Sequence, residues 1–374
     1  MPDVCHSPPA YVGPPDADHA FATRRFQGIS SLAITPGALW ATWYAGPTPD
    51  EDANNYVVLS RSTDAGATWQ ELMVVDPDGP DPLRAFDPQL WVDPQKRLWW
   101  FWTQGEDHHG HYAGLWSMRC DTPDDVAPVW SAPALLATGV MMGKPLVLAS
   151  GDWALPVSTW RTTDNSAGLV VSGDGGHTWE RRGGAQVPRA SRSFDEHQFI
   201  EYADGSIDVF VRTRYGIGRS RSHDQGRNWS TVQPAGIPHP DARFFISRLR
   251  SGNLLLVKHG PLAEKTGRSH LTAFLSRDDG VSWEGGLLID EREKVSYPDG
   301  QQDADGSIVI TYDFDRTGTR TIYLARFREE DILTGRADAP DVRLRQIISR
   351  VGDACSETPL PLPLSPSTKC RDKV

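Results

Sequence analysis

Acidic, basic and phenolic side chains recur at fixed distances from the apolar segments of this chain. Eleven residues before such a segment lie Asp87, Glu196, Arg243 and Tyr297, and five residues after one lie Arg212 and Asp313. A tyrosine becomes a nucleophile when a neighbouring carboxylate accepts its proton. Arginines hold carboxylates through paired, charge-assisted hydrogen bonds. If the segments are equivalent, these residues lie at matching points of the fold, and their spacing concentrates charge in one cavity.

The apolar segments are the elements that must position these residues. They begin near Leu39, Leu98, Trp153, Ile207, Leu254 and Ile308, at a mean interval of about 54 residues. Repeats of roughly 40–50 residues with several strands each are typical of β-propellers. The residues before and after each segment then lie on neighbouring antiparallel strands, at the same end of the ring. We predict an all-β fold, a six-bladed β-propeller of four-stranded antiparallel blades.

A turn motif with the pattern S-x-D-x-G-x-x-W supports this repeat. It occurs four times, each time after a β-type run, and begins at Ser62, Ser172, Ser222 and Ser276. The serine and aspartate bind local backbone amides, the glycine takes a positive φ, and the tryptophan packs beneath the turn. The motif therefore predicts a hairpin turn with its own packing anchor. The copy expected in the second blade is degenerate.

Composition limits the class of protein. The 374 residues include 38 Lys and Arg against 49 Asp and Glu, and the net charge of −11 argues against nucleic-acid and anionic-membrane partners. No run approaches the roughly 18 apolar residues of a membrane-spanning helix, and Met1–Tyr11 lacks the layout of a secretory signal. We therefore expect a cytoplasmic protein. We divide it into a Pro-rich extension (1–20), one propeller (21–350) and a Pro-rich tail (351–374).

Neither a metal nor another cofactor is expected. The four cysteines are scattered and form no C-x-x-C pair. One loop gathers possible metal ligands, namely Asp107, His108, His109 and His111, but no predicted strand or helix holds their spacing.

The four turn motifs are the Asp-box repeats of the sialidase (neuraminidase) superfamily, which the chain resembles along nearly its full propeller. In the segment DEHQFIEYADGSIDVFVRT, the resemblance implies that Glu196 is the catalytic glutamate and Arg212 a substrate-binding arginine. Arg268, which precedes an Asp-box strand, is similar to the next binding arginine of the family. Tyr297, in SYPDGQQDADGSIVITYD, resembles the nucleophilic tyrosine, with Asp313 at the end of the following strand.

The chain departs from the family pattern at its first arginine. Sialidases open with an R-I-P motif whose arginine completes a three-arginine clamp on the substrate carboxylate. Here the sequence RFQGISSL places Gln27 and Gly28 at that point. Arg24, Arg25 and Arg243 are candidates to replace the missing arginine.

The acid/base aspartate is also open. In the family it lies in the loop before the first Asp box, where PDEDANNYVVL offers Asp50 and Asp52. Asp87 is a second candidate, because it shares the blade register of Glu196 and Tyr297. Lys144 is the blade-three candidate if insertions shift the register there. The predicted substrate-binding residues are Arg212, Arg268, Arg243, Gln27, Asp313 and Lys144.

The predicted function is a retaining, sialidase-like exo-glycosidase that removes a terminal acidic sugar from a glycan. Its nucleophile is Tyr297, its base is Glu196, and its acid/base is Asp52 or Asp87. Two alternatives stay open. One is a polysaccharide lyase or atypical glycosidase acting on uronic-acid glycans, such as a rhamnosyl-glucuronate unit. The other is a propeller that binds sugar without chemistry.

Overall fold

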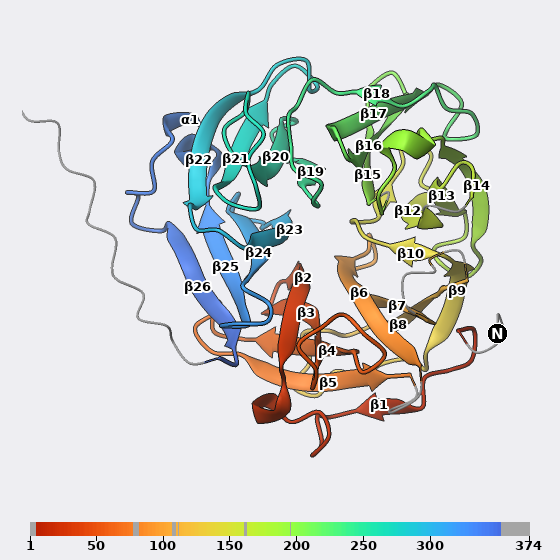
Figure 1. The fold of residues 1–374 in the computed structure, drawn as a ribbon, viewed down its shortest axis with the longest axis vertical. Helices are drawn as coiled ribbons and strands as arrows, with labels where there is room; N and C mark the ends of the chain where they lie inside the picture. The colour runs from red at the N-terminus through yellow and green to blue at the C-terminus, as the bar shows by residue number, and fades with distance from the viewer. Residues whose placement is uncertain are drawn as a thin grey trace, which may run out of the picture.

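Each apolar segment that the sequence spaces about 54 residues apart forms the second strand of its own antiparallel sheet. The computed structural model describes residues 5–77, 82–106, 110, 112–160, 163–194 and 196–352. In these residues six sheets, each built from a continuous stretch of chain, stand around a ring (Figure 1). The predicted six-bladed propeller is confirmed. The second strands are β3 (Ala38–Gly46), β7 (Leu98–Glu106), β12 (Trp153–Ser158), β16 (Ile207–Thr213), β20 (Leu254–His259) and β24 (Ile308–Phe314).

The remaining strands flank these six within each blade. The innermost strands are β2 (Phe26–Thr35), β6 (Leu83–Val92), β10 (Val140–Met141) with β11 (Leu146–Val147), β15 (His197–Glu201), β19 (Phe245–Arg248) and β23 (Val295–Gln302). The third strands are β4 (Tyr56–Ser62), β8 (Gly114–Cys120), β13 (Ala167–Ser172), β17 (Gly216–Ser222), β21 (Leu271–Ser276) and β25 (Thr321–Phe327). The outer strands are β5 (Gln70–Asp76), β9 (Ala134–Thr138), β14 (Glu180–Ala185), β18 (Gln233–Pro234), β22 (Glu284–Asp290) and β26 (Arg343–Arg350).

The Asp-box motifs form the turns between third and outer strands in blades one, three, four and five. In the first, Ser62 Oγ donates to Asp64 Oδ1 (2.7 Å) and accepts from the amide of Gly66 (2.9 Å). Asp64 Oδ1 also accepts from the Thr68 amide (2.9 Å), and Gly66 takes a φ of 89°. The same bonds recur in the other three copies. These turns lie at the outer strands, so the motif shapes the blades rather than the centre of the ring.

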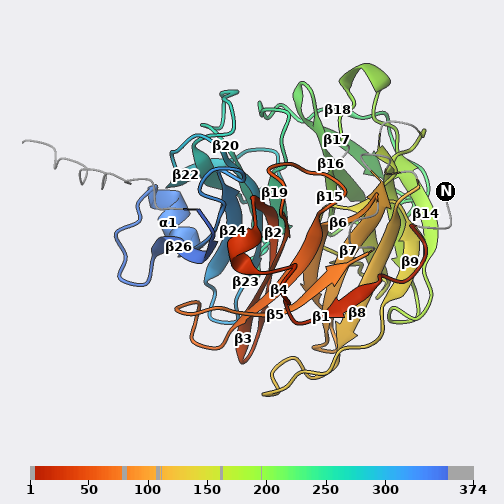
Figure 2. The ribbon, with the colours of Figure 1, turned by 60° about the horizontal axis from the view of Figure 1, so that its bottom comes forward.

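Two blades differ from the expected four strands. In blade one, β1 (Tyr11–Gly13) pairs with β5 as a fifth strand, so part of the predicted extension belongs to the propeller (Figure 2). In blade three, two short strands, β10 and β11, pair with different parts of β12 and together take the place of the innermost strand. Among the described residues, the helical elements are the 3-10 helices η1 (Phe21–Thr23) and η3 (Arg189–Ser191) and the short helix α1 (Glu329–Thr334), which ends at Gly335 with a φ of 66°.

Side chains join the first blade to the last. Asp299 on β23 accepts hydrogen bonds from Ser31 Oγ (2.7 Å) and the Leu32 amide (3.0 Å) of β2. Gln301 accepts from the amide of Ile34 (3.0 Å). The last strand in the described residues, β26, forms the outer edge of blade six and contributes to none of these bonds between β2 and β23.

Apolar side chains fill the space between and within the blades. The largest of them, Trp40, Trp43, Trp100 and Trp102, are fully buried, so these tryptophans stabilise the core. In the part of the chain described above, no helix is long and apolar enough to span a bilayer. The predicted tail lies outside the described residues from position 353 onward.

Candidate active site

A buried tyrosine of blade six and a buried glutamate at the start of blade four are hydrogen-bonded to each other. Tyr297, on β23, donates a hydrogen bond from Oη to Glu196 Oε1 (3.0 Å), and the two residues are 7% and 5% exposed. Arg212, on β16, donates from one terminal nitrogen to the same Glu196 oxygen (2.9 Å) and to Tyr297 Oη (3.4 Å). Burial, followed by the charge of Glu196, raises the pKa of the Tyr297 phenol to about 12. The phenol is therefore neutral at physiological pH and lies beside a group able to accept its proton.

Backbone bulges interrupt the innermost strands of blades one, two and six. The pairing of β23 with β24 shifts between Ser296 and Asp299, and Tyr297 takes a φ of 51°. The equivalent shift on β6 gives Asp87 a φ of 49°, and the one on β2 gives Ile29 a φ of 58°. A bulge re-aims its side chain, and a left-handed conformation at a non-glycine residue stores strain that is common at functional sites.

Two predicted arginines stand beside the phenol. Arg212 is held by Asp241, whose Oδ1 accepts from its Nε (2.6 Å), and its guanidinium lies over the Phe194 ring (4.9 Å to the centroid). Arg268 donates to Ser296 Oγ (3.2 Å), and its guanidinium carbon lies 5.5 Å from the centroid of the Tyr297 ring. Both cations are therefore fixed near the phenol by their own partners.

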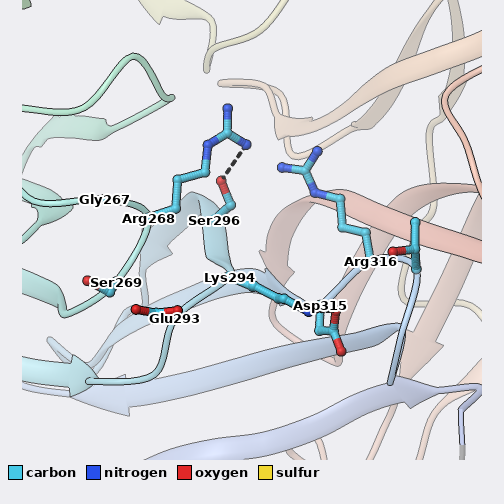
Figure 3. A pocket seen from close by; sticks show the side chains of 9 residues that line it. Gly267, Arg268, Ser269, Glu293, Lys294, Ser296, Asp315 and Arg316 are labelled. Carbon is cyan, nitrogen blue, oxygen red and sulfur yellow. Dashed lines mark hydrogen bonds and ion pairs between the residues drawn. The ribbon is translucent and has the colours of Figure 1, made fainter.

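A third arginine, which the sequence did not predict, lies closer to the phenol than Arg268. The guanidinium carbon of Arg316 is 4.4 Å from the centroid of the Tyr297 ring. Figure 3 shows Arg268 and Arg316 on either side of Ser296, with their guanidinium groups directed to the same side. Together they line a cavity of about 500 Å³ with Gly267, Ser269, Glu293, Lys294, Asp315 and Thr317. In the sequence, the feature that could have pointed to Arg316 is its position three residues after Asp313, a predicted site residue.

Asp87 has the properties of a general acid. Its carboxyl is 7% exposed. Burial and then the charge of Glu196 raise its pKa to about 8, although Arg84 and Arg243 act in the opposite direction. A carboxyl with this pKa is largely protonated at neutral pH and can give a proton to a leaving group.

Asp52, the other candidate for the acid, stabilises its own loop. Its Oδ1 accepts from the amide (2.9 Å) and the side chain (3.1 Å) of Asn54. Burial alone would raise its pKa, but the nearby Thr48 hydroxyl and the hydrogen bonds from Asn54 outweigh burial and lower it. The neighbouring Glu51 is the residue of this loop that reaches the site, where it accepts from Arg316 (2.9 Å) and from Tyr44 Oη (2.7 Å).

Lys144 and Arg243 belong to an ionic network in the middle of the ring. Lys144 Nζ lies 2.7 Å from Asp299 Oδ2, and one Arg243 terminal nitrogen lies 3.0 Å from Asp299 Oδ1. Lys144 also donates to the carbonyl of Leu90 (2.7 Å), so it links the blades. This placement gives Lys144 a structural role in place of the predicted contact with substrate. Arg243 belongs to the same network. Its positive charge also opposes part of the rise in the pKa of Asp87, so Arg243 lies near the site.

Gln27 lies away from the cluster, and the structure corrects its prediction as a substrate-binding residue. Its Oε1 accepts from Trp43 Nε1 (3.0 Å), and its Nε2 donates to the carbonyl of Arg320 (2.8 Å) and to Ser349 Oγ (3.0 Å). The β2 bulge begins at the next residue, so alternation along the strand directs Gln27 outward.

Neither of the other two candidates for the missing first arginine, Arg24 and Arg25, contacts the Tyr297 phenol. Arg24 is fully committed to both oxygens of Glu71 (2.6 and 2.7 Å), and Arg25 is exposed. Asp313 lies at the site but beneath it, where Oδ2 accepts from the Ile29 amide (2.7 Å) and from Arg316 Nε (3.0 Å). Asp313 therefore orients the Ile29 backbone and the Arg316 side chain, and it does not line the cavity.

No group of three or more His, Cys, Asp or Glu side chains in the described ranges is arranged to hold a metal ion. Asp107, His108, His109 and His111 of the loop considered above lie outside these ranges.

Replacing Asp299 by asparagine is expected to destabilise the propeller strongly. The change leaves the buried cations Lys144 and Arg243 without their counter-charge, which costs about 3–5 kcal/mol in comparable buried pairs. Urea denaturation measures the loss in the free energy of unfolding. As a control, Glu284→Gln removes an exposed ion pair with Arg277 (2.7 Å) and should cost under about 1 kcal/mol. Equal losses in the two variants would refute a structural role for the network.

Comparison with known proteins supports the assignment of the fold. A family model for the BNR repeat-like domain matches residues 37–310. A sialidase of Bacteroides fragilis is 25% identical over 287 residues, which cover 64% of this chain and 51% of that protein. A sialidase of Micromonospora viridifaciens is 26% identical over 298 residues, which cover 68% and 45%. The chain thus spans about half the length of the curated relatives it matches.

Solved structures share the architecture at low identity. The intramolecular trans-sialidase from Ruminococcus gnavus has a TM-score of 0.65 at 16% identity, covering 84% of this chain and 96% of that one. The sialidase of Trypanosoma rangeli, in complex with sialic acid, has a TM-score of 0.59 at 13% identity, covering 81% and 54%. A Dyadobacter fermentans protein of unknown function has a TM-score of 0.58 at 18% identity, covering 79% and 92%. These likenesses show the fold alone. Because the family model spans more than half of the chain, the chain belongs to the BNR repeat-like family and is an atypical member of the sialidase superfamily, with glycine at position 28.

Proposed function

We propose that this propeller is a retaining exo-glycosidase that removes a terminal acidic sugar from a glycan. The observation that carries the proposal is the buried hydrogen bond between Tyr297 and Glu196, with Arg212 bound to both (3.0, 2.9 and 3.4 Å). A phenol paired with a carboxylate is an activated nucleophile. Sialidases are the recognised glycosidases in which tyrosine takes this role.

The reaction follows from the positions of these groups. Tyr297 Oη attacks the anomeric carbon while Glu196 accepts the phenolic proton, and the glycosidic bond breaks as Asp87 protonates the departing oxygen. A covalent glycosyl-tyrosine results. Asp87, now a carboxylate, then takes a proton from water, which attacks the same carbon. The phenol leaves and recovers its proton from Glu196, so the anomeric configuration is retained.

The choice of tyrosine fits an acidic substrate. A sugar carboxylate near the anomeric carbon repels an incoming anion, whereas a neutral phenol meets less repulsion. The phenol here is surrounded by the guanidinium groups of Arg212, Arg268 and Arg316, which attract a carboxylate. The names of the curated relatives support a sialic acid as that sugar. A uronic acid offers the same charge, and the test below separates the two.

The test is an activity screen with the full chain. A methylumbelliferyl sialoside, a methylumbelliferyl glucuronide and a rhamnosyl-glucuronate oligosaccharide are incubated with the protein, and fluorescence, ultraviolet absorbance and product masses are followed. Hydrolysis adds one water to the products. Elimination instead yields an unsaturated uronate that absorbs in the ultraviolet, an outcome that would replace the glycosidase with a lyase. Binding with intact glycan after long incubation would leave a sugar-binding propeller.

A further inference from the structure

Arg316 occupies a position that the sequence analysis did not predict for a site residue. It follows β24 in blade six, and its side chain is 14% exposed. Its Nε donates to Asp313 Oδ2 (3.0 Å), and one terminal nitrogen donates to Glu51 Oε1 (2.9 Å). The second terminal nitrogen is buried and has no hydrogen-bond partner among the described residues. A buried guanidinium N–H without a partner costs free energy, which a ligand that accepts it would recover.

Gly28 makes this position possible. A Cβ atom built on Gly28 would lie 2.6 Å from Cδ and 2.7 Å from Cγ of Arg316, closer than packed carbon atoms approach. The backbone there is also fixed, because the amide of Gln27 donates to the carbonyl of Arg316 (3.1 Å). Any side chain at position 28 therefore displaces the arginine. Glycine here leaves open the space through which a blade-six arginine crosses to the phenol.

We infer that Arg316 binds the carboxylate of the substrate, together with Arg212 and Arg268, and that Gly28 is the residue that admits it. The three guanidinium groups surround one phenol, and Arg268 and Arg316 line the same cavity of about 500 Å³ (Figure 3). Asp313 and Glu51 orient Arg316, so it is held in place before substrate binds. The inference rests on the proposed function for the acidic sugar, and it assigns a specificity-determining residue to that site.

A double-mutant cycle tests the link between the two positions. Arg316→Ala should weaken kcat/KM for the methylumbelliferyl glycoside of the acidic sugar by about 10- to 100-fold, as expected for a charged hydrogen bond. The methyl ester of the same sugar should lose less than about threefold, because it carries no anion. Gly28→Ala should reproduce the loss for the acid. In Gly28→Ala/Arg316→Ala the loss should equal that of Arg316→Ala alone, because both changes remove the same arginine.

Arg316→Lys and Arg292→Ala guard against a general folding defect. The lysine keeps the charge but lacks the planar fork, so it should restore part of the preference for the acid over the ester. Arg292 is a comparable arginine in the link between blades five and six, 3.9 Å from the Phe314 ring centroid and bonded to Asp290 (2.9 Å). Its removal should leave the ratio of acid to ester unchanged.

Two results would overturn the inference. In the first, the wild-type protein is active, and Arg316→Ala lowers kcat/KM for the acid and for the methyl ester by the same factor. In the second, Gly28→Ala adds its full effect to that of Arg316→Ala. A wild-type protein that neither cleaves nor binds any acidic sugar would instead overturn the proposed function itself.

Discussion

Tyr297→Phe is expected to lower kcat on the acidic glycoside by at least about three orders of magnitude, as removal of a catalytic nucleophile does in other enzymes. The phenylalanine ring keeps the position between the guanidinium groups of Arg268 and Arg316. What disappears is the oxygen that attacks, with its hydrogen bonds to Glu196 and Arg212. Because the ring remains, the loss of stability should be limited to the hydrogen bonds of the hydroxyl, on the order of 1 kcal/mol, and the protein should stay folded. Steady-state kinetics and thermal unfolding of the same preparations check both expectations.

Tyr312→Phe provides the matched control for this change. Tyr312 is also a buried tyrosine of blade six, and its hydroxyl also donates to a carboxylate, that of Asp290 (3.0 Å). This hydroxyl lies outside the site, so its loss should leave kcat within about twofold while costing roughly 1 kcal/mol of stability. Mass spectrometry of wild-type protein quenched during turnover should place one sugar residue on the peptide that contains Tyr297. Near-normal turnover by Tyr297→Phe would exclude the covalent mechanism.

The sequence predicts this fold well because its repeat is local. An Asp box is defined by contacts within eight residues, and an apolar strand by the pattern of apolar residues over a short segment. Both can therefore be recognised without knowing which distant residues they contact. The spacing of strands within a blade also predicts which site residues of that blade lie next to each other. Glu196 and Arg212 are joined by the backbone hydrogen bond from the Arg212 amide to the Glu196 carbonyl (2.8 Å), as their register predicts.

The prediction fails where contacts cross between blades or where a bulge resets the alternation. On β2 the residue in register with the site is Gly28, where the bulge begins, and the preceding Gln27 bonds instead to Trp43 and Ser349. Arg316 enters the site where Gly28, 288 residues earlier in the sequence (316 − 28), lacks a Cβ atom. Neither fact follows from local pattern, since each depends on how blade one meets blade six.

Asp87→Asn is expected to reduce kcat/KM by about 10²- to 10⁴-fold on a natural disaccharide, whose leaving alcohol needs a proton. The effect should be much smaller on the methylumbelliferyl glycoside, because this phenol departs without protonation. In the wild-type protein, kcat/KM should fall as the pH rises through about 8, where Asp87 loses its proton. The variant should lack this alkaline limb. Initial rates with the two substrates across the pH range provide the measurement.

The same substitution should stabilise the fold, and the sign follows from the pKa. Burial raises the pKa of Asp87 from 3.8 in the unfolded chain to about 8 in the folded protein, so the folded state binds more protons between these values. The contribution of Asp87 to stability is therefore complete below pH 3.8 and is lost as the pH rises to about 8. Asparagine mimics the protonated carboxyl at every pH. The variant should therefore unfold on the order of a few degrees higher than wild type at pH 8, and the difference should shrink toward acid pH.

Asp52→Asn separates the two candidates for the acid. The nearby Thr48 hydroxyl and the hydrogen bonds from Asn54 keep the pKa of Asp52 low, so this carboxylate has no proton to give near neutral pH. Its replacement should disturb the loop and lower kcat/KM by less than about tenfold, equally for the natural and the methylumbelliferyl substrate. It should also leave the alkaline limb in place, since Asp87 still titrates. If the limb vanishes in Asp52→Asn and survives in Asp87→Asn, the acid is Asp52, and the raised pKa of Asp87 reflects only a carboxyl buried next to Glu196.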